Sequence, residues 1–459
     1  MRQWKIGWMS CALALTAGCA SVPERKAFEA VEKEESEERL TPARVPVPSR
    51  LPSITDASLL DDYLAYGALN NPELEAAFNR WKAALEAVPQ ARSLPDPKFN
   101  YGYFIREVET RVGPQQQRLG LAQMFPWFGK LELQGAVAME EAEAARLRYE
   151  SAKLKLFFQI KEAYYELYYL RQAIGITEDN IQLIKHLESV AQSRFKSGAP
   201  VTGVVKAQVE LSKLSDRLLT LNEMRDPIAA KLNASLNRAP DAPLPWPESA
   251  DVTMAAIDVG RWAAWMKENP ELKSLEALVR KEDKAMALAR KAYYPDLTLG
   301  VDYIQTGDAL NAATPDDGKD AVIAQFSVNI PLWTGKYRAG VAEARARGDA
   351  ARQTRKNREN LLMADVRMAL YRFRDAERKI DLYRNTLVPQ ARGALEVAQS
   401  SYESGQTDFL NLIDAQRLLL QFELEAERAV ADREQQLAEI EMLVGRELPR
   451  LGTEGEQTP

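Results

Sequence analysis

Residues Ala321–Lys336 read AVIAQFSVNIPLWTGK, and the spacing of apolar residues changes within this stretch. Apolar residues take every second position from 322 to 330, opposite positions that are mostly polar. A period of two over about ten residues is typical of a β-strand whose two sides meet different environments. Pro331 ends the strand, because proline lacks the N–H that a ladder needs. The helical period begins after it, so the stretch predicts a strand, a proline joint and a helix.

The same alternation occurs three more times in the chain. Prolines stand where the strands and helices meet, and we expect them to fix the angle of each joint. Trp127 and Trp333 lie beside two of these joints, where aromatic residues suit a membrane interface. The predicted strands cover residues about 98–106, 117–124, 297–306 and 321–330, and the joint prolines are Pro95, Pro126, Pro295 and Pro331.

The chain also repeats its landmarks in order. Asn71–Leu74 (NPEL) returns as Asn269–Leu272, and the joint Phe125–Lys130 (FPWFGK) returns as Ile330–Lys336 (IPLWTGK). Matching positions lie about 200 residues apart, far beyond the roughly 20 to 50 residues of a solenoid repeat. We therefore expect two similar domain-sized units. The predicted boundaries are 56–240 for the first repeat, 241–257 for a linker, 258–448 for the second repeat and 449–459 for a tail.

Most of each repeat has a helical pattern. The longest tracts, about 129–195 and 336–402, would each extend roughly 100 Å as one helix. Phe157, Ile160 and Tyr164 recur at steps of three and four, as in coiled-coil seams, so we interpret them as packing groups. Shorter tracts are expected at about 56–92, 202–237, 258–292 and 407–446. The predicted fold is mainly α with a small β part, built from a duplicated helix-strand-strand-helix-helix unit.

The beginning of the chain has the features of an export signal. Residues 1–18 combine positive charge, a short apolar run and small residues, and Leu-Thr-Ala-Gly-Cys at 15–19 resembles a bacterial lipobox. Thr16 departs from that pattern, in which leucine is usual. We expect lipidation at Cys19, and the alternative is an ordinary signal with an incidental cysteine. The Glu- and Pro-rich residues 19–55 then form an extended tether.

The strands make a prediction about assembly. Four strands are too few to close a barrel, and open strand edges are not tolerated in hydrocarbon. If these strands span a membrane, other copies of the chain must complete the barrel, and a closed cyclic oligomer is the natural solution. A soluble four-stranded sheet is the alternative on periodicity alone.

Other classes of function receive little support. His186 is the sole histidine and lies in a helical tract, and phosphate-binding glycine motifs are absent, so we expect no enzyme and no metal site or cofactor. The net charge of −6 argues against a nucleic-acid partner. A lipid-anchored periplasmic coiled-coil scaffold without a pore would explain the helices and the tether. It would not explain the duplicated two-sided strands.

The lipobox, the two-fold order of elements and the Pro-Trp joints resemble the TolC-like outer-membrane efflux channel family. The likeness is to its lipoprotein branch, the outer-membrane factors of RND-type efflux systems. This resemblance implies a homotrimer with a twelve-stranded transmembrane β-barrel, continued by a long α-helical barrel across the periplasm. It implies an outer-membrane conduit that receives cargo from a periplasmic adaptor and an inner-membrane pump. The cargo stays open between organic toxicants, metal ions and polypeptides, and Ala20 after the cysteine favours outer-membrane sorting.

By the same resemblance, the tips of the long helices form the periplasmic entrance. Some members carry two aspartates three residues apart at the constriction. Here Asp414 matches the second, whereas Asn411 occupies the first, and Asp408 lies one turn earlier. Three copies of each aspartate around a narrow lumen would favour cations, and the alternative for Asp408 is that it caps the following helix. The expected adaptor-contacting residues are Gly198, Ala199, Gly203, Gly405 and Gln406.

Overall fold

The computed structural model describes residues 54–247, 262–311 and 313–448. The predicted signal at 1–18, Cys19 and nearly all of the tether lie outside the described residues. Most of the linker and the tail at 449–459 lie outside them as well.

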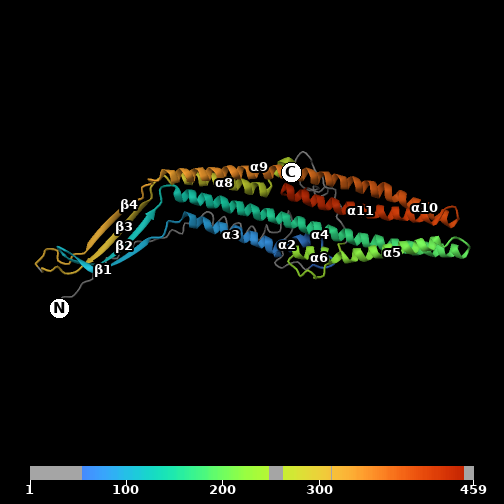
Figure 1. Ribbon diagram of the computed structural model, residues 1–459, viewed down its shortest axis with the longest axis horizontal. Coiled ribbons are helices and arrows are strands. Elements are labelled where there is room, and N and C mark those ends of the chain that lie inside the picture. Colours follow the sequence, from blue (N-terminus) through green and yellow to red (C-terminus); the bar gives the residue numbers. More distant parts are fainter. Residues whose placement is uncertain (1–53, 248–261, 312, 449–459) are drawn as a thin grey trace, which may run out of the picture. The chain divides into compact units, whose positions relative to one another are not determined.

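The elements occur twice in the same order (Figure 1). The first repeat contains α2 (Leu60–Asn70), α3 (Pro72–Arg92), β1 (Lys98–Thr110), β2 (Gly113–Phe125), α4 (Lys130–Lys196), α5 (Thr202–Glu223) and α6 (Arg225–Ser235). The second contains α7 (Trp262–Met266), α8 (Pro270–Lys291), β3 (Leu297–Thr306), β4 (Ala321–Val328), α9 (Thr334–Leu382), the π-helical turn η1 (Tyr383–Leu387), α10 (Val388–Glu403) and α11 (Phe409–Val444).

The sequence predicts one helix over residues 336–402, but the structure shows an interrupted one. The turn η1 interrupts it between α9 and α10, directly before Val388 and Pro389. Pro389 has no N–H to donate and its ring crowds the preceding turn, so the wider π turn accommodates it. The tract at 202–237 similarly breaks at Met224, between α5 and α6.

The repeated Asn-Pro motif has the same structural role in both halves. Asn71 is the N-cap of α3 and accepts a hydrogen bond from the Leu74 N–H, while its amide donates to the Ser235 carbonyl at 2.9 Å. Asn269 caps α8, and its amide donates to the Leu443 carbonyl at 2.8 Å. Each asparagine therefore starts one helix and ties it to the last helix of its own repeat.

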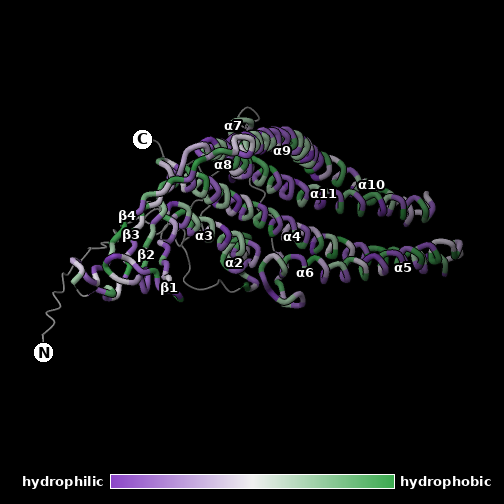
Figure 2. Tube along the Cα trace, turned by 60° about the vertical axis from the view of Figure 1, so that its left-hand side comes forward, coloured by the Kyte–Doolittle hydropathy of each residue, from purple (hydrophilic) through white to green (hydrophobic). Residues whose placement is uncertain are grey.

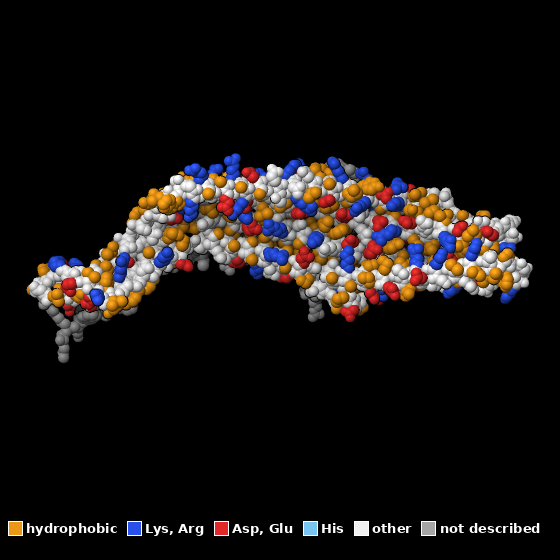
Figure 3. Space-filling view, in the orientation of Figure 1, with side chains coloured by type: hydrophobic (Ala, Val, Ile, Leu, Met, Phe, Trp, Pro, Cys, Tyr) orange, Lys and Arg blue, Asp and Glu red, His pale blue; other side chains and the backbone are white. Residues whose placement is uncertain are grey.

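The four strands form one antiparallel sheet in the order β1-β2-β3-β4. Its first hairpin is longer than the predicted 98–106 and 117–124, because pairing continues to Thr110 and Gly113 at the turn. One face is largely apolar and exposed, and orange apolar side chains are visible over the strands in Figure 3. This face includes Phe99, Tyr101, Leu121, Val301 and Phe326.

The opposite face of the sheet carries a polar network. Asp302 on β3 is 5% exposed and accepts hydrogen bonds from Arg118 on β2 and Gln325 on β4. Gly120 makes room for this carboxylate, since any Cβ there would collide with it. The register therefore separates the two sides of the sheet in the way that the alternating sequence predicts.

The helices next to the sheet form a layer in the order α3, α4, α8, α9. The two inner helices come from different repeats, and ion pairs such as Arg280–Glu140 join them at 2.8 Å. The layer ends at α3 on one side and α9 on the other, just as the sheet ends at β1 and β4. No helix within the described ranges has an apolar stretch long enough to cross a bilayer.

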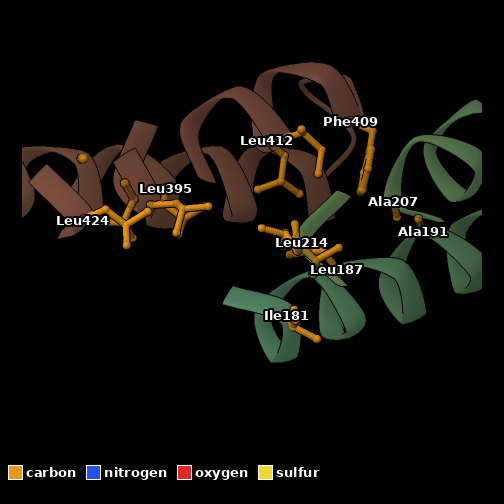
Figure 4. Packing of buried hydrophobic residues seen from close by; sticks show 14 of the residues in the cluster. Ile181, Leu187, Ala191, Ala207, Leu214, Leu395, Phe409, Leu412 and Leu424 are labelled. Atoms are coloured by element: carbon orange, nitrogen blue, oxygen red, sulfur yellow. The ribbon is translucent and has the colours of Figure 1, made fainter. Parts of the chain in front are cut away.

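Away from the sheet, α4, α5, α10 and α11 pack around a common apolar core (Figure 4). Leu187 and Leu214 enter this core from the pair α4 and α5. Phe409 and Leu412 enter it from α11 of the other pair. Figure 2 shows apolar and polar residues interleaved along these helices, as coiled-coil seams require. Nearer the sheet, a buried ion pair between Lys161 on α4 and Glu441 on α11 spans 2.6 Å.

Candidate functional site at the helix tips

The first tip joins α4 to α5. Gly198 has φ +98°, a left-handed conformation that favours glycine, and it is exposed with open space around it. The N–H of Ala199 donates to the Arg194 carbonyl at 3.0 Å, which closes the end of α4. Ala199 itself is half-buried.

The second tip joins α10 to α11 in the same way. Gly405 has φ +82°, and the N–H of Gln406 donates to the Ser401 carbonyl at 2.8 Å. Both residues are exposed. The two Ser-Gly turns that the sequence singled out are therefore equivalent helix ends, one in each repeat.

The two tips lie against each other at Gly203, near the start of α5. Gly203 is buried, and a Cβ there would lie 3.2 Å from the Tyr402 hydroxyl and 3.4 Å from Phe409. Glycine thus permits a close approach of the two helical pairs. Of the expected adaptor-contacting residues, Gly203 faces the other tip, whereas Gly198, Gly405 and Gln406 are exposed.

Sequence reasoning missed the contact that joins the tips. Arg194 on α4 donates a hydrogen bond to the Tyr402 carbonyl, and its guanidinium lies 4.5 Å from the centre of the Tyr402 ring. Tyr402 also packs edge-on against Phe409 at 5.3 Å. Burial raises the pKa of the Tyr402 phenol, and Arg194 opposes that rise. The sequence offered only one signal, namely that Arg194 and Tyr402 each lie about one turn before a Ser-Gly pair.

Asp408 is the N-cap of α11. Its carboxylate accepts a hydrogen bond from the Asn411 N–H at 3.1 Å, and the Asn411 amide donates to the Thr407 hydroxyl at 2.7 Å. Both side chains are exposed. The capping interpretation of Asp408 therefore holds in this chain, and the cap still leaves a negative charge exposed at the tip.

Asp414 lies farther along α11 and has a different environment. Its carboxylate is exposed and lies 3.6 Å from Arg417, which in turn forms an ion pair with the buried Glu210 of α5 at 2.5 Å. The hydrogen bond to Glu210 raises the pKa of the Arg417 guanidinium. Arg417 thus pairs more closely with Glu210 than with Asp414, and the Asp414 carboxylate is exposed to solvent.

An exposed apolar strip flanks these charges. Val201, Val205 and Val209 follow one another at four-residue steps along the start of α5, and all three are about half exposed. Phe195 and Leu410 are also exposed at the tips. Aliphatic residues at this spacing form a surface suited to another helix.

The predicted proline joints lie at the other ends of the long helices. Pro95 and Pro295 stand between a helix and a strand, and Pro126 and Pro331 stand between a strand and the next helix. The sequence did not predict the role of Asp296, which follows Pro295. Its carboxylate accepts from the Trp127 N–H at 2.8 Å and from Lys130 at 2.7 Å.

Comparison with known proteins identifies the family. The family model described as "Outer membrane efflux protein" matches residues 67–238 and 265–446, more than half of the chain and one segment in each repeat. The chain belongs to this family. The TolC-like resemblance and the mainly α fold with a small β part are confirmed.

Individual members of the family are distant from this chain. The pyoverdine export outer membrane protein OpmQ of Pseudomonas putida is 25% identical over 62% of this chain and 60% of that protein. The toxin and drug export protein A of Aggregatibacter actinomycetemcomitans is 24% identical over 58% of each chain. The alignments thus span less than two thirds of either relative. The solved outer-membrane channel OprN has a TM-score of 0.72 at 16% identity, covering 88% of this chain and 99% of that one.

No group of three or more His, Cys, Asp or Glu in the described part of the chain is placed to hold a metal ion. The acidic residues at the tips are instead spread along α11, where they contribute charge to a surface.

Proposed function

We propose that this chain is the outer-membrane channel of a tripartite efflux system, a passive conduit from a periplasmic adaptor and an inner-membrane pump to the exterior. One observation carries the proposal: this member of the outer membrane efflux protein family has a sheet with one apolar and one polar face at one end of its long helices. Its apolar face suits lipid, and the Arg118–Asp302–Gln325 network on the other face suits water.

The channel is a homotrimer in this proposal. The sheet and the helical layer both end in open edges, so a single chain cannot enclose a lumen. Three copies would give twelve strands in one closed barrel and continue it as a helical barrel in the periplasm. A closed ring also removes the strand edges that lipid does not tolerate.

The lipobox-like residues 15–19 support export and anchoring. Residues 1–18 would direct export and be removed, and Cys19 would then carry the lipid. The channel would thus be an outer-membrane lipoprotein with its helices extending into the periplasm.

The helix tips form the periplasmic entrance. The Arg194–Tyr402 contact holds the two helical pairs of a chain together there, and Asp408 and Asp414 supply exposed negative charge. Gly198, Ala199, Gly405 and Gln406 mark the surface offered to the adaptor, and the buried Gly203 lies behind it, between the two tips. The exposed strip Val201, Val205 and Val209 extends that surface along α5.

Membrane fractionation tests the proposal against the scaffold alternative. The full chain is compared with a variant whose residues 1–19 are replaced by a cleavable secretion signal without a lipidation site. We expect both proteins to stay in the outer membrane until detergent is added and to size as heat-sensitive trimers. Release of the lipid-free variant as a monomer without detergent would contradict the channel and support the scaffold.

A further inference from the structure

The strand-helix joint of the second repeat is tied to the joint of the first. Asp296 accepts from the Trp127 N–H and from Lys130 across that boundary, and Lys130 also donates to the Tyr294 carbonyl at 3.0 Å. The Tyr294 ring stacks on Trp127 at 5.6 Å. Four interactions therefore join two consecutive repeats at one place, next to the boundary between sheet and helices.

Each of these residues has a counterpart in the other repeat. Trp127-Phe128-Gly129-Lys130 corresponds to Trp333-Thr334-Gly335-Lys336, and Tyr294-Pro295-Asp296 corresponds to Leu94-Pro95-Asp96. The counterpart contacts are not made among the residues that the structure describes. In the described residues, neither Asp96 nor Lys336 has an ion-pair partner, and both are exposed. Trp333 is 76% exposed and Leu94 is 47% exposed.

Both Pro-Asp joints are also bound within their own repeat, although by residues that are not counterparts of each other. The amide of Gln123 donates to the Pro95 carbonyl at 2.7 Å, and the Asn329 amide oxygen accepts from the Asp296 N–H. Gln123 lies in β2 and Asn329 directly follows β4, so each Pro-Asp joint is bound near the end of the second strand of its own repeat. The backbone of both joints is held in place, while the exposed Asp96 carboxylate has no ion-pair partner among the described residues.

The order of elements explains why one chain cannot complete the pattern. Asp296 reaches Lys130 because α8 lies beside α4, which belongs to the preceding repeat. The equivalent neighbour of Lys336, at the start of α9, would be the Pro95-Asp96 joint that follows α3. That joint would have to lie on the side of α9 that faces away from α8. Within one chain α3 and β1 lie at the opposite edge of the layer and the sheet.

We propose that Asp96 of one copy of the chain binds Lys336 and the Trp333 N–H of the next copy, with Leu94 covering the Trp333 ring. This contact between chains would have the same design as the contact that Asp296, Lys130, Trp127 and Tyr294 form between the two repeats of one chain. It rests on the proposed closed ring of copies and specifies which residues meet at its interface. A charge-assisted pair beside a buried aromatic ring would fix the register of neighbouring chains.

Thiol cross-linking tests this contact in the full-length protein. Asp96→Cys and Lys336→Cys are combined in one chain, outer membranes are treated with a short bismaleimide, and products are separated by denaturing electrophoresis. We expect covalent dimers and trimers from this variant. The matched control with Lys130→Cys and Asp296→Cys should cross-link within the monomer, and the unmodified chain should give no product.

Native sizing of the same samples separates the possible failures. A trimer in which the control pair reacts but the Asp96–Lys336 pair gives no intermolecular product would overturn this contact and leave the channel proposal standing. A monomer on native sizing would overturn both.

A charge exchange provides a second test that does not depend on cysteine. Asp96→Lys alone and Lys336→Asp alone should each lower the temperature at which the trimer dissociates. The double exchange should recover most of that loss, because every interface then carries the reversed pair. Additive losses in the double variant would contradict the pairing.

Discussion

At the scale of single residues, Asp408 and Asp414 present the same carboxylate in two different settings. The Asp408 side chain accepts a hydrogen bond from the Asn411 N–H at the start of α11, whereas the Asp414 carboxylate lies 3.6 Å from Arg417. Removing Asp408 therefore changes both the helix cap and the charge. Asparagine caps helices about as well as aspartate, so Asp408→Asn separates the two effects.

We predict that the double variant Asp408→Asn, Asp414→Asn keeps the stability of the parent and loses part of its cation preference. The reason is that the proposed threefold entrance would lose six carboxylates while the cap of α11 remains. The measurement is the reversal potential of single channels in a salt gradient. An unchanged reversal potential would place these aspartates away from the conducting path.

The matched variant Asp408→Ala should behave differently. Loss of the cap should cost about 1 kcal/mol of helix stability, visible as a lower midpoint of thermal unfolding. Equal midpoints for Asp408→Ala and Asp408→Asn would show that the cap contributes nothing.

The sequence left these residue roles open for a physical reason. An aspartate after a glycine turn fits both a helix cap and an exposed charge, and the sequence does not reveal the hydrogen bond that decides. Arg194 and Tyr402 were missed because their contact joins helices more than 200 residues apart.

At the scale of elements, the buried asparagines of the two Asn-Pro motifs connect α3 and α8 to the last helix of their own repeats. Asn269 is 3% exposed and provides both the N-cap of α8 and a hydrogen bond to the Leu443 carbonyl. Its loss would therefore remove a cap and leave a carbonyl of α11 without its partner.

We predict that Asn269→Ala destabilises the protein by about 2 to 3 kcal/mol, more than an exposed cap alone would. Asn269→Ser should cost less, because its hydroxyl can still cap α8 and only the donor to Leu443 is lost. Thermal unfolding of the two variants, with Asn71→Ala as the counterpart in the first repeat, measures the difference. Equal effects of alanine and serine would show that the cap contributes nothing.

The elements were largely predictable because their signals are local. Alternation marked the strands and proline marked the joints, so Ala321–Lys336 forms a strand, a joint and a helix as expected. The π turn was not predicted, although Pro389 is visible in the sequence. A proline inside a helical tract can kink it, break it or widen one turn, and packing of the neighbouring helices selects among these outcomes.

At the scale of the whole molecule, the duplication accounts for the layer and for its open edges. The second repeat lies beside the first and repeats its elements, so each boundary between repeats has a similar design. The contact of Asp296 with Lys130 could not be predicted from the sequence, because it depends on which repeat lies next to which joint. With the order of helices known, the same contact predicts the boundary between chains.

Ion flow through a planar lipid bilayer tests the central claim most directly. The purified full-length protein is added at increasing amounts, and the current is recorded under a fixed voltage. An outer-membrane channel predicts discrete, uniform conductance steps that scale with the added protein and favour cations. A correctly folded trimer that inserts into the bilayer and passes no current above the lipid background would contradict it, provided that Arg194→Ala, which removes the contact between the tips, also passes none.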